Sequence, residues 1–383
     1  MNSSEGTRLI PFNRPYVPAS GIQAVRESLL SARLSGDGPY TVKASESISL
    51  ITGASKILLT PSCTHALELA CRLIGLGPGD EVILPSFNFP SAANAVVLSG
   101  ATPVFVDVDP LTHNMELPQV LMGVSPRTRA IIVLHYAGVA AATREIVDFA
   151  DGFGITVIED SAHGFGVQSA SGTLGSAGAL STYSFHETKN IQCGEGGAIQ
   201  INSLELFDRA EVLREKGTNR SRFFRGLVDK YSWEDQGSSW LLADPLAALL
   251  SAQLDVYDEI QSTRVTIWTR YFSELQEWAD RNAFVMPYEP PSQSNAAHMF
   301  YLICPSLNDR TRFIAHLQAH QISAVFHYQP LHLSRAGRRF ARSAVETNET
   351  ERLANQLVRL PLYVGLSHLE QDRVIDAITS FRT

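Results

Sequence analysis

Short apolar runs alternate with helix-like runs from about residue 46 of this 383-residue chain, and this alternation constrains the fold more than any other feature. The strand-like runs occupy residues 81–85, 102–109, 129–138 and 155–163. Apolar residues at helical spacing occupy residues 64–76, 91–100 and 143–154. Strands that alternate with helices predict a parallel sheet covered on both faces. In such a sheet, chemistry is expected at the carboxyl ends of the strands.

The pattern changes after about residue 250. A long helical pattern with charges on one side covers residues 251–281, and shorter runs follow at 298–304, 310–321, 323–332 and 370–382. The chain is too long for one small core. We therefore expect an α/β protein with a large domain over residues 1–250, built on a mostly parallel central sheet. A smaller α+β domain is expected over residues 251–383.

Composition excludes several classes of function. The net charge of −8 disfavours non-specific nucleic-acid binding, and no apolar run is long enough to span a bilayer. The first residues lack the basic start and apolar core of a signal peptide, and the four cysteines are scattered. We expect a cytoplasmic protein with free thiols and no metal site. The chain contains no P-loop motif, and Asn190 stands where HExxH requires its second histidine.

Two charged residues stand in unusual surroundings. Asp160 ends the apolar run at 155–160, and Lys189 follows in a loop of small polar residues before Gly194 to Gly197. Taken singly, Asp160 could be a helix N-cap and Lys189 a solvated surface lysine. Together they match what pyridoxal phosphate needs. The lysine can form a Schiff base with the cofactor aldehyde, and the aspartate can keep the ring nitrogen protonated.

The segment from Ser62 to His65 immediately precedes a helical pattern, where unpaired N–H groups and the helix dipole favour an anion such as phosphate. An ordinary N-cap at Ser62 or Thr64 is the alternative. Phe89 follows a strand, so its ring could lie on a cofactor face or belong to the core. Glycines 194–197 could give the backbone freedom near a cofactor or form an ordinary turn.

Taken together, Ser62-Cys63-Thr64, Phe89, "EDSAH" (159–163), "SFHETKN" (184–190) and "GEGGA" (194–198) resemble the DegT/DnrJ/EryC1/StrS sugar aminotransferases. These are fold-type I, pyridoxal-phosphate-dependent enzymes that act on nucleotide-linked keto sugars. The resemblance extends from "PFNRP" near the start to "LPLYVGLS" near the end. "REKGTNRSRFFRG", "VDKYSW" and "FHYQPLH" are most similar to members that aminate C4 of dTDP-4-dehydro-6-deoxy-D-glucose.

The resemblance implies a role for each matched residue. Lys189 would be the catalytic lysine, Asp160 the partner of the ring nitrogen, and His163 a hydrogen-bond partner of the phenolic oxygen. Phe89 would stack on the ring. The phosphate would be held by Cys63, Thr64, His65 and Ser184. The family commonly has an asparagine that reaches the neighbouring subunit's phosphate, and this chain has the shorter Ser239 there. Because members of the family build each active site from two subunits, the resemblance also implies a homodimer with shared active sites.

The segment from Arg214 to Lys230 carries six basic and two acidic residues in an acidic protein, with aromatic residues among and after them. A solvated loop is the alternative. Arginine forks suit a diphosphate, and flat rings suit a base or sugar. A nucleotide sugar is thus a better expected ligand than RNA. The expected substrate contacts are Asn88, His186, Lys216, Arg220, Arg222, Phe224, Arg225, Tyr231, Tyr328 and His332.

The resemblance implies that L-glutamate donates the amino group, which gives dTDP-4-amino-4,6-dideoxy-D-galactose and 2-oxoglutarate for a surface glycan. Three alternatives stay open: amination of another nucleotide-linked keto sugar, a non-catalytic binding protein on the same fold, and an enzyme for simple amino acids. Related dehydratases have histidine at the lysine position, and Lys189 argues against them.

Overall fold

The computed structural model describes residues 8–291 and 294–382. An eight-stranded sheet in the order β1-β9-β8-β5-β4-β2-β3-β12 forms its centre. β9 runs antiparallel to both of its neighbours, and every other pairing in the sheet is parallel. The strands are β1 (Ile57–Thr60), β2 (Glu81–Pro85), β3 (Thr102–Val106), β4 (Thr128–Leu134), β5 (Thr156–Asp160), β8 (Leu180–Ser184), β9 (Gly197–Ile201) and β12 (Arg342–Ser343). The expectation of a mostly parallel central sheet is confirmed.

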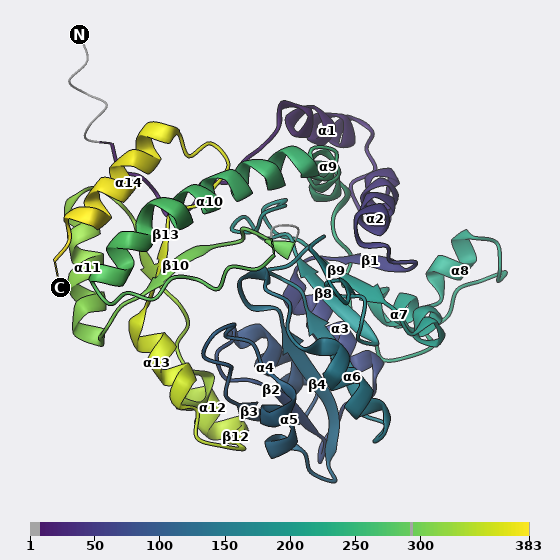
Figure 1. Ribbon diagram of the computed structural model, residues 1–383. Helices are drawn as coiled ribbons and strands as arrows, with labels where there is room; N and C mark the ends of the chain where they lie inside the picture. The colour runs from purple at the N-terminus through teal and green to yellow at the C-terminus, as the bar shows by residue number, and fades with distance from the viewer. Residues whose placement is uncertain (1–7, 292–293, 383) are drawn as a thin grey trace.

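Helices cover both faces of this sheet (Figure 1). Successive residues of a strand point to opposite faces, so Leu58 packs in one apolar cluster and Leu59 in another. One face is covered by α3 (Cys63–Leu73), α4 (Pro90–Leu98) and α7 (Phe207–Arg214). The other face is covered by α2 (Pro39–Thr52), α5 (Leu117–Gly123), α6 (Thr143–Asp151) and α9 (Asp244–Leu254). α1 (Ala19–Leu30) packs on α9, and the hairpin β6 (Gln168–Ser169) with β7 (Gly172–Thr173) lies apart from the sheet.

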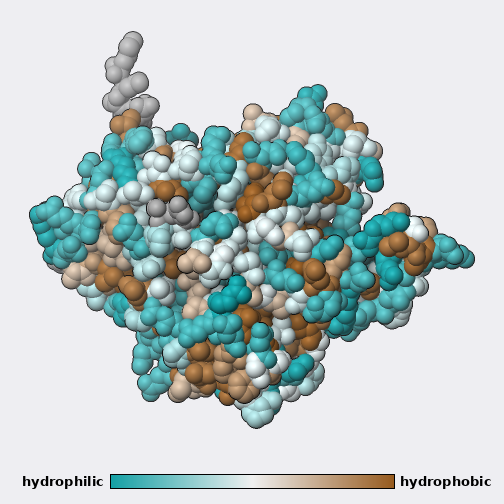
Figure 2. Space-filling model, turned by 45° about the vertical axis from the view of Figure 1, so that its right-hand side comes forward, coloured by the Kyte–Doolittle hydropathy of each residue, from teal (hydrophilic) through white to brown (hydrophobic). Residues whose placement is uncertain are grey.

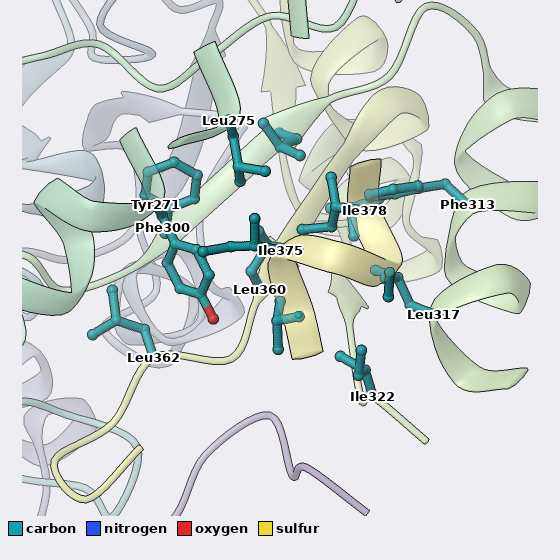
Figure 3. Close-up of a cluster of buried hydrophobic side chains, with 14 of the residues drawn as sticks. Tyr271, Leu275, Phe300, Phe313, Leu317, Ile322, Leu360, Leu362, Ile375 and Ile378 are labelled. Carbon is teal, nitrogen blue, oxygen red and sulfur yellow. The ribbon is translucent and has the colours of Figure 1, made fainter. Parts of the chain in front are cut away.

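The second half of the chain forms a smaller layer around the antiparallel sheet β10-β13-β11, with β10 (Phe300–Ile303), β13 (Leu357–Leu360) and β11 (Val325–Phe326). Helices α10 (Tyr257–Arg281), α11 (Leu307–Ala319) and α14 (His368–Ser380) pack on one face of that sheet. Figure 3 shows the resulting core, where Tyr271 and Phe300 approach Leu360 and Ile375. The shorter helices are α8 (Arg220–Phe224), α12 (Arg335–Phe340) and α13 (Asn348–Gln356).

The helical pattern expected over residues 251–281 belongs to two helices. α9 ends at Leu254, and α10 begins at Tyr257 after Val256 leaves the helical region (φ −117°, ψ 25°). α9 is buried along most of its length inside the large domain, whereas α10 has one buried face that reaches the small sheet. The two helices therefore belong to different packing environments, which periodicity alone did not separate.

Besides the passage from α9 to α10, two segments connect the halves. Ile10 is fully buried in the core of the small half, where its N–H donates to the Gln321 carbonyl (2.9 Å). β12 extends the large sheet beside β3, and Arg342 on β12 donates to the buried carboxylate of Glu81 (2.6 and 3.0 Å). We propose residues 1–250 and 251–383 as the two domains, with α9 extending the packing of the first as far as Leu254. Among helices in the described ranges, none has the length and apolar character needed to cross a bilayer.

Candidate active site

Four candidate segments meet at one edge of the large sheet. They follow β1, β2, β5 and β8, and these four strands run in the same direction because β1 and β8 are both antiparallel to β9. Their carboxyl ends line a cavity of about 1080 Å³. Segments 298–299, 325–329 and 359–362 of the small half line the opposite side. The cavity thus lies between the two halves of the chain.

Lys189 lies in the loop that joins β8 to β9. Its backbone N–H donates to the His186 carbonyl (2.9 Å), and the side chain faces the cavity. The next residue, Asn190, donates to Gln261 of α10 (3.1 Å) and to the Ala296 carbonyl (2.7 Å). Burial lowers the pKa of the Lys189 ammonium to about 8, although nearby Cys63 and Asp160 act to raise it. The loop therefore presents an amine that is largely desolvated.

Asp160 is the last residue of β5 and is buried at the cavity wall. Burial raises the pKa of its carboxyl, while the Ala162 N–H, which donates to Oδ1 at 3.2 Å, and the charge of Lys189 act in the opposite direction. A buried carboxylate is costly unless it is paired, so this site is suited to a cationic partner such as a protonated ring nitrogen.

His163 belongs to a group of aromatic rings at the base of the cavity. Its Nε2 lies 3.3 Å from the Tyr328 hydroxyl, and its ring stacks on His298 with centroids 4.5 Å apart. Its buried Nδ1 has no hydrogen-bond partner among the described residues. Burial holds the pKa of His163 well below its ordinary value, so the ring is neutral. A buried, unpartnered ring nitrogen is available to a bound molecule.

The N-terminus of α3 opens onto the same cavity. Ser62 is the N-cap, and its hydroxyl accepts the His65 N–H (3.2 Å). The N–H groups of Cys63 and Thr64 precede the first intrahelical bond, from the Ala66 N–H to the Ser62 carbonyl (3.1 Å). They are therefore free to bind an anion together with the helix dipole. The structure confirms the Ser62 N-cap, and it leaves the N–H groups of Cys63 and Thr64 free, so a phosphate there stays a prediction.

Asn88 and Phe89 follow β2 at the cavity wall. The Phe89 ring is 58% exposed and its centroid lies 6.2 Å from that of Tyr328, so it is a cavity residue and not a core one. The Asn88 side chain accepts the Phe89 N–H (2.6 Å), and its buried Nδ2 has no partner in the described part of the chain.

Ten of the expected residues share this cavity: Cys63, Thr64, Asn88, Phe89, Asp160, His163, Ser184, His186, Lys189 and Tyr328. Five others line a separate, more open cavity of about 1500 Å³ beside α7 and α8: Lys216, Arg220, Phe224, Arg225 and Ser239. The remaining four, His65, Arg222, Tyr231 and His332, line neither cavity. His332 contacts Ser86 (2.7 Å) and Thr347 (2.9 Å).

Several basic residues of the 214–230 segment are already paired. Lys216 and Arg220 lie 2.9 and 3.3 Å from the buried carboxylate of Glu215, and Arg225 pairs with Glu211. The segment itself projects from the body of the molecule, as Figures 1 and 2 show. Hydrophobic side chains are exposed on it: Phe224, Leu227, Tyr231 and Trp233. An exposed apolar patch of this kind marks an interaction surface.

Several titratable cavity residues were absent from the expected set, among them His298 and Arg359. Both come from the small half, more than 100 positions after Lys189. A signal existed for Arg359, since a single arginine interrupts the apolar run "LVRLPL". In a strand buried on both faces, such a charge indicates a special environment. No comparable signal marks His298, which lies at the edge of an ordinary apolar run.

The donor set fits pyridoxal phosphate. A desolvated amine, a buried carboxylate and the free N-terminus of α3 line one cavity. The orphaned Nδ1 of His163 and Nδ2 of Asn88 are buried polar atoms that a bound molecule would satisfy. Lys189 and Asp160 would hold the reactive end of the cofactor and its ring nitrogen, and Cys63 and Thr64 its phosphate.

Comparison with known proteins gives consistent matches. Residues 16–379 match the model of the DegT/DnrJ/EryC1/StrS aminotransferase family. The chain is 30% identical over 378 residues to the spore coat polysaccharide biosynthesis protein SpsC of Bacillus subtilis (strain 168), covering 96% of each chain. It is similar to the aminotransferase TlmJ of Streptoalloteichus hindustanus (TM-score 0.86, 29% identity, 97% of each chain).

A further similar structure is the PLP-form of Spr1654 from Streptococcus pneumoniae, a proposed sugar aminotransferase. Its TM-score is 0.87 at 25% identity, over 97% of this chain and 98% of that one. A PMP-form of the same protein is equally similar, with a TM-score of 0.88.

Proposed function

The chain belongs to the DegT/DnrJ/EryC1/StrS aminotransferase family, and from that premise we propose its substrates and the role of each site residue. It is a PLP-dependent sugar aminotransferase. The proposed reaction moves the amino group of L-glutamate to C4 of dTDP-4-dehydro-6-deoxy-D-glucose. The products are dTDP-4-amino-4,6-dideoxy-D-galactose and 2-oxoglutarate.

One observation carries this proposal: Lys189, which is partly buried, and Asp160, which is buried, line the same cavity as the free N-terminus of α3. The closer sequence similarity of "SFHETKN" and "FHYQPLH" supports the C4 substrate, and Tyr328 of the second segment lies in this cavity.

When bound, pyridoxal phosphate supplies an electron sink for the carbon that loses its proton. Lys189 Nζ removes the α proton of L-glutamate as a neutral amine, which its lowered pKa favours. In the second half of the reaction the same atom delivers a proton to C4 of the sugar. Because one amine on one wall of the cavity delivers that proton, it sets the stereochemistry at C4.

Asp160 would stabilise positive charge on the ring nitrogen, and the Cys63 and Thr64 N–H groups would bind the phosphate. The unpartnered Nδ1 of His163 would form a hydrogen bond with the phenolic oxygen of the cofactor, and the exposed Phe89 would stack on the cofactor ring. Asn88, His186, Tyr328 and Ser184 complete the walls. The small half contributes the rest of the cavity lining and would help to exclude water from the reacting atoms.

We also propose that two copies of the chain build each complete site. Lys216, Arg220, Phe224, Arg225 and Ser239 line a different cavity from Lys189, so within one chain they do not face its reacting atoms. A second copy that docks on the exposed apolar residues of the projecting segment would bring a basic surface toward a nucleotide diphosphate. His65, Arg222, Tyr231 and His332 retain their expected roles as proposals.

The visible absorption band of the cofactor-loaded enzyme tests the proposed function. The band should bleach on addition of L-glutamate and return on addition of dTDP-4-dehydro-6-deoxy-D-glucose. Lys189→Ala should lower turnover by about 10²–10⁴-fold while the protein stays folded. Lys43→Ala is the matched control, because Lys43 is an exposed lysine on α2 that pairs with Asp255.

Each outcome tests a different part of the proposal. A band that bleaches and returns only with another keto-sugar nucleotide would keep the transaminase and replace the sugar. Full turnover by Lys189→Ala would remove the proposed proton shuttle. No response of the wild-type enzyme to any amino donor would favour a non-catalytic binding protein on the same fold.

A further inference from the structure

Arg359 lies on β13, the central strand of the small sheet, and faces the active-site cavity. Its neighbours Val358 and Leu360 point the other way, into the core of the small half. β13 pairs with β10 and β11 on its two sides, with Tyr301 and Val325 opposite Arg359. The position is therefore defined by a hydrogen-bonded sheet, and it places a guanidinium in the same cavity as Lys189.

The guanidinium has no counter-ion. Within the described ranges, Arg359 forms no ion pair and no side-chain hydrogen bond, and its Nε is buried without a partner. Its closest defined contact is with the face of Phe12, 4.7 Å from guanidinium carbon to ring centroid. A cation–π contact of this kind orients the group but leaves its five N–H donors unsatisfied.

The charged and titratable groups around Arg359 do not supply the missing anion. Burial lowers the pKa of Arg359, whereas the phenols of Tyr136 and Tyr328 act to raise it. Arg359 in turn disfavours positive charge on Lys189 and on three buried imidazoles, those of His163, His298 and His327. Two carboxylates line the cavity, and both come from the large half: Asp160, which acts on Lys189, and Glu195, which lies 3.7 Å from His186. The small-domain side of the cavity thus has excess positive charge.

We infer that Arg359 binds the α-carboxylate of the amino donor. A planar guanidinium binds a carboxylate through two parallel hydrogen bonds, which fixes position as well as affinity. The α-carboxylate is bonded directly to the carbon whose proton Lys189 removes, so an anchor in the same cavity as Lys189 is placed to hold it. The diphosphate of a nucleotide sugar is separated from C4 by the sugar ring, and it fits the more distant basic segment better.

The inference rests on the proposed function and deepens it, because it assigns donor recognition to the small half of the chain. It also explains why an unpaired charge is retained on a partly buried side chain whose Nε is fully buried, where it is costly for stability. Binding of a carboxylate would satisfy the guanidinium only while the donor is present.

The test compares Arg359→Met and Arg359→Lys with the wild-type enzyme and with Arg312→Met. Arg312 is a half-exposed small-domain arginine on α11 that pairs with Asp309, so it serves as the matched control. The two half-reactions are followed separately by the cofactor absorbance, first with L-glutamate and then with the keto sugar. Arg359→Met should raise the dissociation constant for L-glutamate by about 10–100-fold, because a charge-assisted bidentate contact is lost.

Arg359→Lys should recover part of this affinity, since it keeps the charge but not the fork. The rate of the sugar half-reaction should change by less than about 3-fold in either variant. Arg312→Met should change the rate of neither half-reaction. L-Glutamine keeps the α-carboxylate and has an amide in the side chain, so Arg359→Met should weaken it as much as L-glutamate. A loss confined to L-glutamate would overturn the α-carboxylate assignment.

Thermal unfolding gives a readout that does not depend on turnover. Without ligand, Arg359→Met should unfold at the same or a higher temperature than the wild type. Added 2-oxoglutarate should stabilise the wild type and should not stabilise the variant. An Arg359→Met protein that fails to fold would contradict the inference, because it would show a structural role.

Two outcomes separate the inference from the proposed function. If the wild-type band does not respond to L-glutamate, the proposed function fails. If the wild type responds and Arg359→Met binds L-glutamate with unchanged affinity, only the inference fails. Selective loss of the sugar half-reaction would assign Arg359 to the diphosphate, and this result would also overturn the inference.

Discussion

At Lys189, desolvation decides which form of the amine is present. An ordinary lysine has a pKa near 10.4 and is almost entirely protonated at neutral pH. Burial lowers the pKa of Lys189 to about 8, and the carboxylate of Asp160 limits this fall. A group with a lowered pKa releases its proton at lower pH, so a neutral amine is available well below pH 10. The same burial also makes the protonated amine costly for stability below that pKa.

The rate at which cofactor-free enzyme captures pyridoxal phosphate should therefore depend on pH in a defined way. Capture needs the neutral amine, so the rate should rise with pH and level off with a midpoint near 8. Growth of the visible band between pH 6 and 10 measures it. Asp160→Asn should move the midpoint lower, because the charge that raises the pKa of Lys189 is removed. A midpoint at 10 or above would show that Lys189 is solvated.

Among the secondary-structure elements, the contact between β9 and the start of α3 sets the anion site. Gly197 begins β9 and pairs with Thr60 at the end of β1. A Cβ on Gly197 would clash with the backbone of Ser62 and Cys63, immediately before and at the first turn of α3. Backbone atoms cannot move away as a flexible side chain can, so glycine is required by close packing at this position.

Gly197→Ala should therefore weaken the binding of pyridoxal phosphate and lower the free energy of unfolding by about 1–3 kcal/mol, as overpacking does. Gly77→Ala is the control, since a Cβ there meets no atom within 4 Å. Cofactor titration by absorbance and denaturant unfolding measure the two effects. Wild-type cofactor affinity in Gly197→Ala would show that the N-terminus of α3 does not hold the phosphate.

For the whole molecule, the division of the expected residues between two cavities is the feature that matters most. Lys189 lies in one cavity and the basic segment lines another, and the segment projects with Trp233 80% exposed. A shared-site homodimer accounts for both facts, because the basic segment of one subunit would then serve the site of the other.

Coexpression of two inactive variants tests this arrangement. Lys189→Ala and the double variant Arg220→Ala/Phe224→Ala should each be inactive as homodimers. In a mixed dimer, one of the two sites combines an intact Lys189 with an intact basic segment. Random mixing makes about half of the dimers mixed, so it should restore about a quarter of wild-type turnover. Differently tagged Lys189→Ala subunits, coexpressed with each other, are the control and should restore none. Purified mixed dimers without activity would place each complete site within one subunit.

Much of the fold and of the cofactor site could be predicted from sequence because the signals are local. Asp160 ends a strand, Ser62 caps a helix, and Lys189 follows another strand, and parallel strands bring such ends to one edge. The break between α9 and α10 was missed, since a continuous helical period hides a change of packing partner.

The sequence by itself determined the parallel architecture and the placement of Lys189 and Asp160 at one edge of the sheet, because both follow from the order of strands and the residues at their ends. Only the tertiary structure decided that Arg359 lines the same cavity as Lys189 and that the basic segment does not. β13 lies about 170 residues after the lysine loop, and its position depends on how the small sheet docks on the large one. Long-range packing of that kind leaves no periodic signal in the chain, so the partners across the cavity become visible only once the two halves are folded together.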